Sequence, residues 1–269
     1  MILQTSNDVA ADPCTVDALS SSKNNEVSQR PAIQRHVTLS LESATNLDAM
    51  CGRLQIMMGL EKVHVFLERS FFIGNHAKDV ADSLERLMEI IAFLPELQWL
   101  KIYGPFLASK AGIPFSALAK IVKRSKTLKY LHISHLNITM ANETECPVAA
   151  MAELLKKNSN IREMRLHFGS TKQKFHPDSQ QSILEMIQHH NNSLECFDLD
   201  HRLLQKFSPR CKHEIAFFLM LNQNGLRKRL LSPDSNATHE DWCEALAENS
   251  AKTDVIFYFL SSNPIFCVP

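Results

Sequence analysis

The sequence predicts an α/β fold in which short parallel strands alternate with helices along most of the chain. One observation is the pattern LxxLxL, whose five copies begin at Leu60, Leu97, Leu128, Ile161 and Leu194, so that successive copies start 37, 31, 33 and 33 residues apart. All fifteen pattern positions are apolar. The other observation is that apolar residues after each copy recur at helical spacing. Internal repeats of this length indicate stacked units, each with a strand and a helix.

The predicted elements follow one another in chain order. Val37, Leu39 and Leu41 alternate with polar residues, which is typical of a strand with one buried face. The five copies of the pattern supply five further strands. The predicted helical faces are Leu47 to Met58, Val80 to Ile91, Leu118 to Val122, Met151 to Leu155 and Ile183 to Ile187. Pro114 and Pro147 stand where prolines are tolerated in a first helical turn.

Repetition of this unit predicts a right-handed solenoid, because a helical crossover between parallel strands is almost always right-handed. Stacking such units gives a curved array with the strands inside the bend. The five copies resemble the ribonuclease-inhibitor-like class of leucine-rich repeats, and the resemblance covers roughly residues 37 to 205. It implies an α/β horseshoe with parallel strands on its concave side.

The repeats depart from this class at position nine. Members of the class usually have Asn or Cys there, and its side chain bonds the loop backbone of neighbouring repeats. In this chain position nine holds Glu68, Pro105, Leu136, Gly169 and Arg202. We therefore expect degenerate repeats with looser turns.

The sequence divides into three regions. Residues 1–30 are rich in Ser, Asn, Asp and Ala without an apolar period, so we expect a disordered segment, or alternatively a short docking motif. We expect residues 31–205 to form the solenoid. Residues 206–269 read as a helical C-terminal cap that covers the apolar end of the last repeat. Within it we expect Thr238 to cap a helix with Asp241, Trp242 to lie on a buried face with Ala245 and Leu246, and the segment 255–260 to be buried.

Composition limits the partners and the compartment. Lys plus Arg equals Asp plus Glu at 29 each, so the net charge gives no reason to expect nucleic acid. No apolar run approaches the roughly 18 to 20 residues that span a bilayer, and the first residues do not form a secretory signal. The seven cysteines include no CxxC pair and are best interpreted as reduced thiols. We expect a cytoplasmic protein, and the nucleus stays open.

Motifs for catalysis, nucleotide binding and metal binding are missing from the sequence. There is no HExxH, GxSxG, GxGxxG or GxxxxGK[ST]. The nearest approaches to metal or nucleophile pairs are His189 with His190, Cys211 with His213, and His239 with Cys243; zinc requires more ligands than these pairs offer. We expect no enzyme activity, no cofactor and no metal. The basic run at residues 227–229 is interpreted as a solvated helix end, with phosphate binding or a nuclear signal as alternatives.

The candidate binding site is the inner face of the strands. Side chains alternate along a strand, so when positions four and six are buried, positions three, five and seven line the concave surface. The candidate binding residues there are aromatic or basic: Trp99, Lys101, Tyr103, Tyr130, His132, Arg165 and His167. Aromatic residues beside arginine and lysine are typical of the centre of a protein interface. The alternative is a solvated strand face.

The sequence therefore favours a non-enzymatic protein–protein interaction module that binds a protein or peptide, with acidic groups, on its concave face. Trp99, Tyr103 and Tyr130 would anchor the partner, while Lys101, His132 and Arg165 would supply charge. Two alternatives remain. One is an adaptor or a scaffold of the substrate-receptor type, and the other is a regulator of a GTPase or another phosphate-bearing partner.

Overall fold

The computed structural model describes residues 35–43, 47–57, 59–72, 77–105, 112–142, 144–168, 176, 178–231 and 236–262. The segment 1–30, for which disorder was predicted, lies outside these residues, as do Met58 and Gly169. Among the described residues, no helix is long and apolar enough to cross a membrane.

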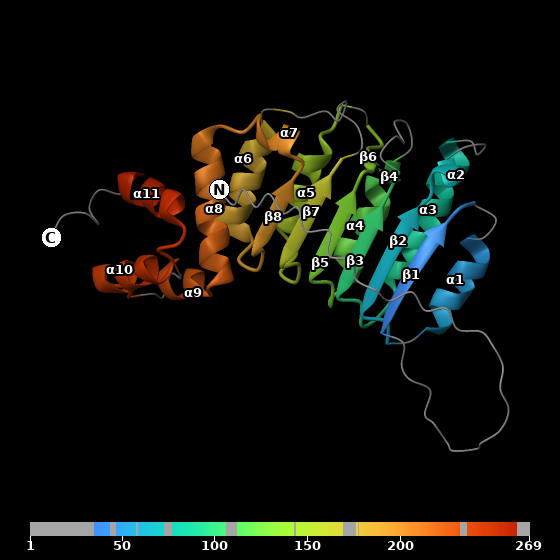
Figure 1. Ribbon diagram of the computed structural model, residues 1–269, viewed down its shortest axis with the longest axis horizontal. Helices are drawn as coiled ribbons and strands as arrows, with labels where there is room; N and C mark the ends of the chain where they lie inside the picture. Colours follow the sequence, from blue (N-terminus) through green and yellow to red (C-terminus); the bar gives the residue numbers. More distant parts are fainter. Residues whose placement is uncertain are drawn as a thin grey trace, which may run out of the picture.

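Six parallel strands form the main sheet, and each strand pairs with the next one of the sheet along the chain (Figure 1). In order across the sheet they are β1 (His36–Leu41), β2 (Lys62–Leu67), β3 (Trp99–Tyr103), β5 (Tyr130–Ser134), β7 (Glu163–His167) and β8 (Cys196–Leu199). A second, two-stranded sheet pairs β4 (Gly112–Pro114) with β6 (Asn137–Thr139). The predicted α/β class with a parallel sheet is confirmed.

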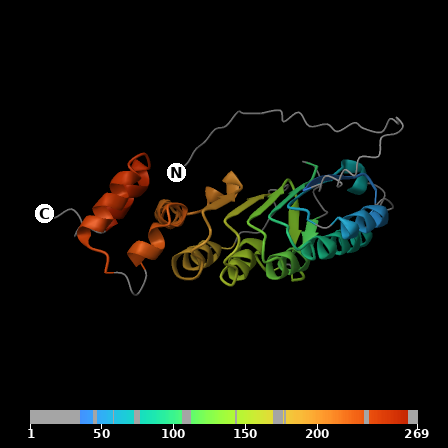
Figure 2. The ribbon, with the colours of Figure 1, turned by 90° about the horizontal axis from the view of Figure 1, so that it is seen from below.

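Helices follow the strands and lie against one face of the sheet, as the two views in Figures 1 and 2 show. Those beside the sheet are α1 (Leu47–Ile56), α3 (Ala77–Ala92), α4 (Phe115–Arg124), α5 (Pro147–Leu155) and α6 (Asp178–Glu185), which continues into the π-helical turn η2 (Met186–His190). The short helices α2 (Arg69–Phe72) and α7 (His201–Leu204) follow the ends of β2 and β8. The chain ends with α8 (Pro209–Gln223), α9 (Leu226–Leu231), α10 (His239–Glu248) and α11 (Thr253–Ser262).

The repeated apolar pattern builds the core between the sheet and these helices. Neighbouring strands pair in register, so that Leu100 lies beside Leu131 and Ile102 beside Ile133. Fourteen of the fifteen pattern positions are buried, and Phe197 is half-buried against the same core. Pro147 occupies the first turn of α5 as predicted, whereas Pro114 stands one residue earlier, as the N-cap of α4.

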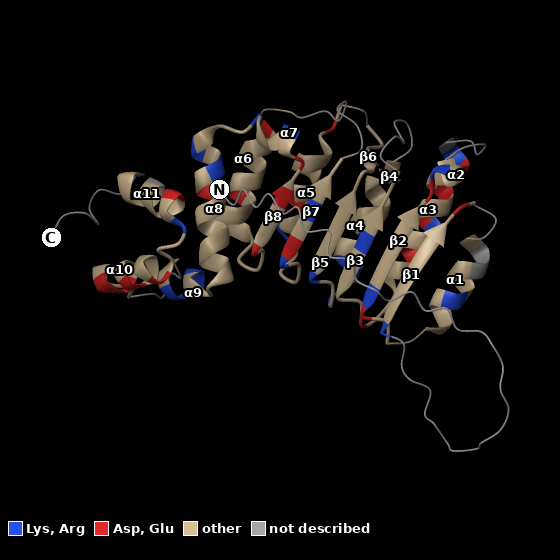
Figure 3. Ribbon diagram, in the orientation of Figure 1, with Lys and Arg blue, Asp and Glu red and all other residues tan. Residues whose placement is uncertain are grey.

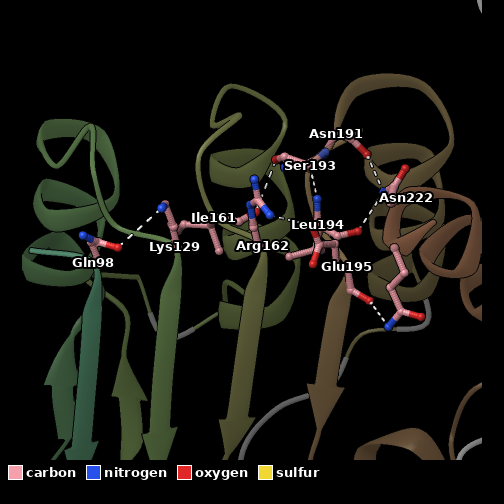
Figure 4. Close-up of polar contacts among 10 residues, drawn as sticks. Gln98, Lys129, Ile161, Arg162, Asn191, Ser193, Leu194, Glu195 and Asn222 are labelled. Atoms are coloured by element: carbon pink, nitrogen blue, oxygen red, sulfur yellow. Dashed lines mark hydrogen bonds and ion pairs between the residues drawn. The ribbon is translucent and has the colours of Figure 1, made fainter. Parts of the chain in front are cut away.

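Amide side chains hold the turns that lead into the strands (Figure 4). Asn158 and Asn191 each stand three residues before a copy of the pattern, and their Oδ1 atoms accept from the backbone N–H of Ile161 and Leu194, both at 2.9 Å. Ser125 Oγ accepts in the same way from Leu128 N at 3.2 Å. We predicted looser turns because position nine of the repeats holds neither Asn nor Cys. The side chains that bond these turns to neighbouring repeats stand before the strands. At position nine, the Glu68 carboxylate also bonds a neighbouring strand, because its Oε1 accepts from Ser40 Oγ at 3.0 Å.

The last strand is covered by α8, whose side chains bond the carbonyl groups at the start of β8. Asn222 Nδ2 donates to Leu194 O at 2.7 Å, and Gln223 Nε2 donates to Glu195 O at 2.8 Å. The Gln223 amide replaces the backbone N–H groups that a further strand would supply at Glu195 O. The Asn222 amide replaces the side-chain hydroxyl that bonds the equivalent carbonyl in earlier repeats, as Ser193 Oγ does at Ile161 O. The helix α8 therefore lies over the last strand, and the capping role of residues 206–269 as a whole stays a prediction.

Arg227 is a structural residue and not part of a solvated basic run. Its half-buried guanidinium donates to the backbone carbonyls of Ile187, Gln188 and Asn191, at the end of η2. Cations near the C-terminus of a helix satisfy carbonyls that lack intrahelical partners. The prediction of a solvated helix end is therefore wrong for Arg227.

A second apolar cluster joins α8 to the last two helices. Thr238 and Asp241 form the predicted capping box at the start of α10, with Asp241 Oδ2 accepting from Thr238 N at 2.7 Å. Trp242, Ala245 and Leu246 are buried as predicted. The segment 255–260 is not buried throughout, because Phe257 of α11 is 75% exposed while Val255 and Phe259 face the cluster. An apolar segment that forms a helix can bury only one side against a neighbour.

Candidate functional site

The face of the sheet that the helices leave bare carries the predicted binding residues (Figure 1). We call this surface the open face and define it by positions three, five and seven of the repeat. In-register pairing places Trp99 beside Tyr130, and Lys101 beside His132. The next pair of strands places His132 beside Arg165, and Ser134 beside His167. All seven predicted residues therefore lie on three adjacent strands, β3, β5 and β7.

Two pairs of stacked aromatic rings lie on the open face. Trp99 and Tyr130 have ring centroids 4.5 Å apart at an interplanar angle of 26°. Phe66 and Tyr103 have centroids 4.9 Å apart at 6°. Phe66, which is 38% exposed, was not among the predicted binding residues, although it stands at position seven of the preceding copy. Phe66 could have been predicted as a binding residue, because aligning the copies of the pattern places it beside Tyr103.

Lys101 lies between these aromatic pairs. Its Nζ is 5.8 Å from the Trp99 ring centroid and 5.6 Å from that of Tyr103. Lys62 Nζ is also 5.8 Å from the Trp99 ring centroid. A ring within about 6 Å attracts a cation through its quadrupole. Among the described residues, the ion pairs of the sheet involve other cations, so neither ammonium group is neutralised by a carboxylate.

His132 does not supply the charge expected of it. Its side chain is buried, with 7% of its surface exposed. Burial lowers the pKa of His132 to about 4, helped by the nearby charges of Arg165 and Lys101 and opposed by Glu163. Its Nε2 lies 2.8 Å from Glu163 Oε1. His132 is therefore a neutral, buried ring at neutral pH.

His64 is a second neutral imidazole on this side of the face. Burial lowers the pKa of His64 to about 4, together with the charges of His36, Lys101 and Lys62. The rings of His36 and His64 meet edge to face with centroids 4.5 Å apart. At neutral pH the positive charge around Trp99 therefore comes from the lysines.

Arg165 and His167 are engaged by acidic neighbours. Arg165 Nε donates to Glu163 Oε1 at 2.6 Å, and Nε2 of His167 lies 3.0 Å from Asp198 Oδ2. The hydrogen bond with Asp198 raises the pKa of His167, and the same bond lowers the pKa of Asp198. The predicted basic residues of the open face therefore comprise an unneutralised Lys101, a buried His132, and Arg165 and His167, which already have acidic partners.

The His167–Asp198 pair gives a pH prediction. We expect Asp198→Asn to lower the pKa of His167, because the substitution removes the charge that stabilises the imidazolium. The pKa of His167 is raised by folding, so its contribution to stability is complete below the ordinary value of 6.5 and is lost as pH rises through the folded pKa. NMR titration of the His167 ring in the wild type and the variant measures this shift. An unchanged titration curve would show that Asp198 does not set the protonation of His167.

The described residues contain no group of three or more His, Cys, Asp and Glu placed to hold a metal ion. Of the pairs noted in the sequence, Cys243 Sγ and His239 Nε2 lie 3.9 Å apart on one side of α10. Burial raises the pKa of Cys211 to about 11, which keeps this sulfur protonated at neutral pH. A protonated thiol is a poor nucleophile.

Comparison with known proteins gives no family for this chain. No protein-family model matches it. No curated protein matches it either. A solved structure described as "Leiomodin-1 Actin-Binding Site 2 (ABS2)" is similar to it with a TM-score of 0.47 and 14% sequence identity, over 68% of this chain and 92% of that chain.

Proposed function

We propose that this chain is a non-enzymatic protein-interaction module, built as a right-handed leucine-rich-repeat solenoid, that binds a protein or peptide on its open face. The observation that carries the proposal is the Lys101 ammonium group, which lies between the rings of Trp99 and Tyr103 without a carboxylate partner among the described residues. A cation held in this way is positioned to receive an acidic group from another molecule.

The solenoid part of the proposal rests on the order of the strands. Each strand of the main sheet lies beside the previous one, runs parallel to it, and is joined to it through helical segments. Crossovers between parallel strands are right-handed in nearly all known cases. A chain of such units offers an extended surface, which repeat proteins commonly use for binding.

The binding part rests on the residues that the open face exposes. Trp99, Tyr103 and Tyr130 are partly accessible, and Phe66 adds an exposed ring. Tryptophan and tyrosine are enriched among the residues that dominate interface energies, because they bury a large area with few rotatable bonds. Glu163 and Asp198 already hold Arg165 and His167, so the proposed contact centres on the part of the face around Lys101.

Two further readings follow from the same residues. An adaptor or substrate-receptor scaffold would use the open face to select its target. A regulator of a GTPase or another phosphate-bearing partner would use Lys62 and Lys101, whose ammonium groups share the Trp99 ring. Phosphate binding through the exposed Lys62 and the half-buried Lys101 would weaken strongly with added salt, whereas contacts made by aromatic rings would not. We propose the cytoplasm as the location, with the nucleus as the alternative.

Affinity capture from native extract tests this function. The bait is the full chain, compared with a Trp99→Ala, Lys101→Glu variant and with a matched control, Phe93→Ala, Lys157→Glu, whose changes lie at helix ends on the other side of the sheet. We expect the partner to be recovered with the wild type and the control but to be lost with the open-face variant. Circular dichroism establishes that all three baits are folded. Equal recovery with all of them would overturn the proposed site.

A further inference from the structure

The open face has two electrically different parts. The basic half consists of Lys62 and Lys101 with the rings that hold them. The acidic half consists of Glu163, Asp198 and Asp200, and Figure 3 shows blue segments on β2 and β3 and red segments on β7 and β8. An interaction surface with both signs of charge restricts the chemistry of its partner.

The basic half keeps its charge at neutral pH. Lys62 and Lys101 are ammonium groups without carboxylate partners among the described residues, and His64 and His132 beside them are neutral, since their pKa values are lowered to about 4. In the positions that define the open face, β1, β2, β3 and β5 carry no Asp or Glu. Nothing on these strands therefore cancels the two positive charges.

The side chains of the acidic half have a net negative charge. Its three carboxylates face one permanent cation, Arg165, and one histidine, His167. Asp198 is still accessible, because 38% of its side chain is exposed in spite of its contact with His167. Asp200 accepts from Arg202 N at 2.9 Å through one oxygen only, so it retains lone pairs for another donor.

The spacing of the strands gives the distance between the basic half and the acidic half. Between β3 and β8 there are three strand intervals, which span about 14 Å at about 4.8 Å each. An extended chain advances about 3.3 Å per residue, so about four residues bridge the two halves. We propose that the partner is an extended protein segment with an acidic and a basic side chain about four residues apart, an inference that rests on the proposed function. The segment would lie across the strands, with its carboxylate at Lys62 and Lys101 and its cationic group at Asp198.

The aromatic rings add one requirement to this segment. Phe66 and Tyr103 stack beside Lys101, and Phe66 is 38% exposed, so an apolar side chain next to the acidic residue would be covered there. A phosphate ion or a nucleotide would occupy the basic half alone and would make no contact with Asp198. The negative charge at β8 therefore favours a protein segment over a purely anionic ligand.

Synthetic peptides test the inference against the full chain by fluorescence anisotropy. Three labelled peptides of equal length and equal apolar content carry glutamate and lysine, two glutamates, or two lysines, in each case four residues apart. A fourth peptide places glutamate and lysine side by side as a spacing control. The proteins are the wild type, Lys62→Glu with Lys101→Glu, and Asp198→Lys, with Asp198→Asn as a milder variant and circular dichroism to verify folding.

We expect the wild type to bind the glutamate–lysine peptide best, by about twofold to fivefold over the others, as is usual for pairs of exposed charges. The Lys62→Glu, Lys101→Glu variant should prefer the two-lysine peptide, and Asp198→Lys the two-glutamate peptide. Asp198→Asn should reduce the preference for the glutamate–lysine peptide over the two-glutamate peptide without reversing it. Weaker binding of the adjacent-charge peptide by the wild type would support the spacing.

Several results would overturn the inference. If the wild type prefers the two-glutamate peptide, only the basic half binds, and the proposed function stands without the acidic contact. If no peptide binds while capture still depends on Trp99 and Lys101, the partner is not an extended segment. If sedimentation velocity shows self-association that Lys62→Glu with Lys101→Glu abolishes, the occupant is a second copy of the chain. If the wild type and the Trp99→Ala, Lys101→Glu variant recover the same partners in the capture experiment, the proposed function itself is overturned.

Discussion

Asn191→Ala is expected to lower the free energy of unfolding by about 3 to 5 kcal/mol, because one buried side chain satisfies four backbone groups in neighbouring turns. Its Nδ2 donates to Leu155 O at 2.9 Å and to Asn158 O at 2.7 Å. Its Oδ1 accepts from Ser193 N at 3.0 Å and from Leu194 N at 2.9 Å. Each buried polar group left without a partner costs about 1 to 3 kcal/mol, and water that enters the turn recovers part of the total.

Urea denaturation followed by circular dichroism measures this effect. Asn192→Ala is the matched control, since it makes the same chemical change one residue away at an exposed position. We expect the control to stay within about 0.5 kcal/mol of the wild type. If the two variants unfold at the same urea concentration with the same slope, the amide contacts do not stabilise the turns.

The strands could be predicted because two independent patterns coincide in them. Residues such as Leu100 and Ile102 fit both the repeated pattern and the alternation of a strand that is buried on one side. The in-register pairing then follows from aligning the copies. The same alignment placed Trp99 beside Tyr130, so the identity of the neighbours on the open face was also predictable.

The side chains that bond these turns were missed although the sequence contains their signal. Ser125, Asn158 and Asn191 recur at 33-residue intervals, each three residues before an apolar pattern position. The resemblance to leucine-rich repeats instead predicts the bonding side chain at position nine, after the strand. A polar residue that caps a turn can bond from either end of the strand, because each end has backbone groups without sheet partners. Only the folded chain shows which end is used.

Charge on the open face was the least predictable property. Arg165 is neutralised by Glu163, two residues before it on the same strand, and this depends on a rotamer that the sequence pattern does not fix. His132 loses its charge because the ring is buried, with Trp99 packed edge to face against it at 5.3 Å. Alternation states which side of the sheet a residue faces. It does not state how much water reaches the side chain.

Trp242→Ala is expected to destabilise the protein by about 3 to 5 kcal/mol, the usual cost of removing a large buried aromatic side chain. Trp242 is 9% exposed and stacks on Phe259 with ring centroids 5.2 Å apart, while Phe259 stacks on Phe217 at 4.5 Å. Phe257→Ala is the matched control, because Phe257 is 75% exposed on α11. We expect the control to change stability by no more than about 0.5 kcal/mol.

The Trp242→Ala variant also tests whether the last helices and the sheet unfold together. Trp99 becomes the only tryptophan, since the chain has two, and its fluorescence reports on the open face. The helix α8 contributes Ile215 to the core of the sheet and Phe217 to the second cluster, so loss of one cluster should weaken the other. We therefore expect the Trp99 signal and the helical circular dichroism signal to change at the same urea concentration. Helix loss well before any change in Trp99 would show that α9, α10 and α11 unfold independently, and the destabilisation would then be confined to them.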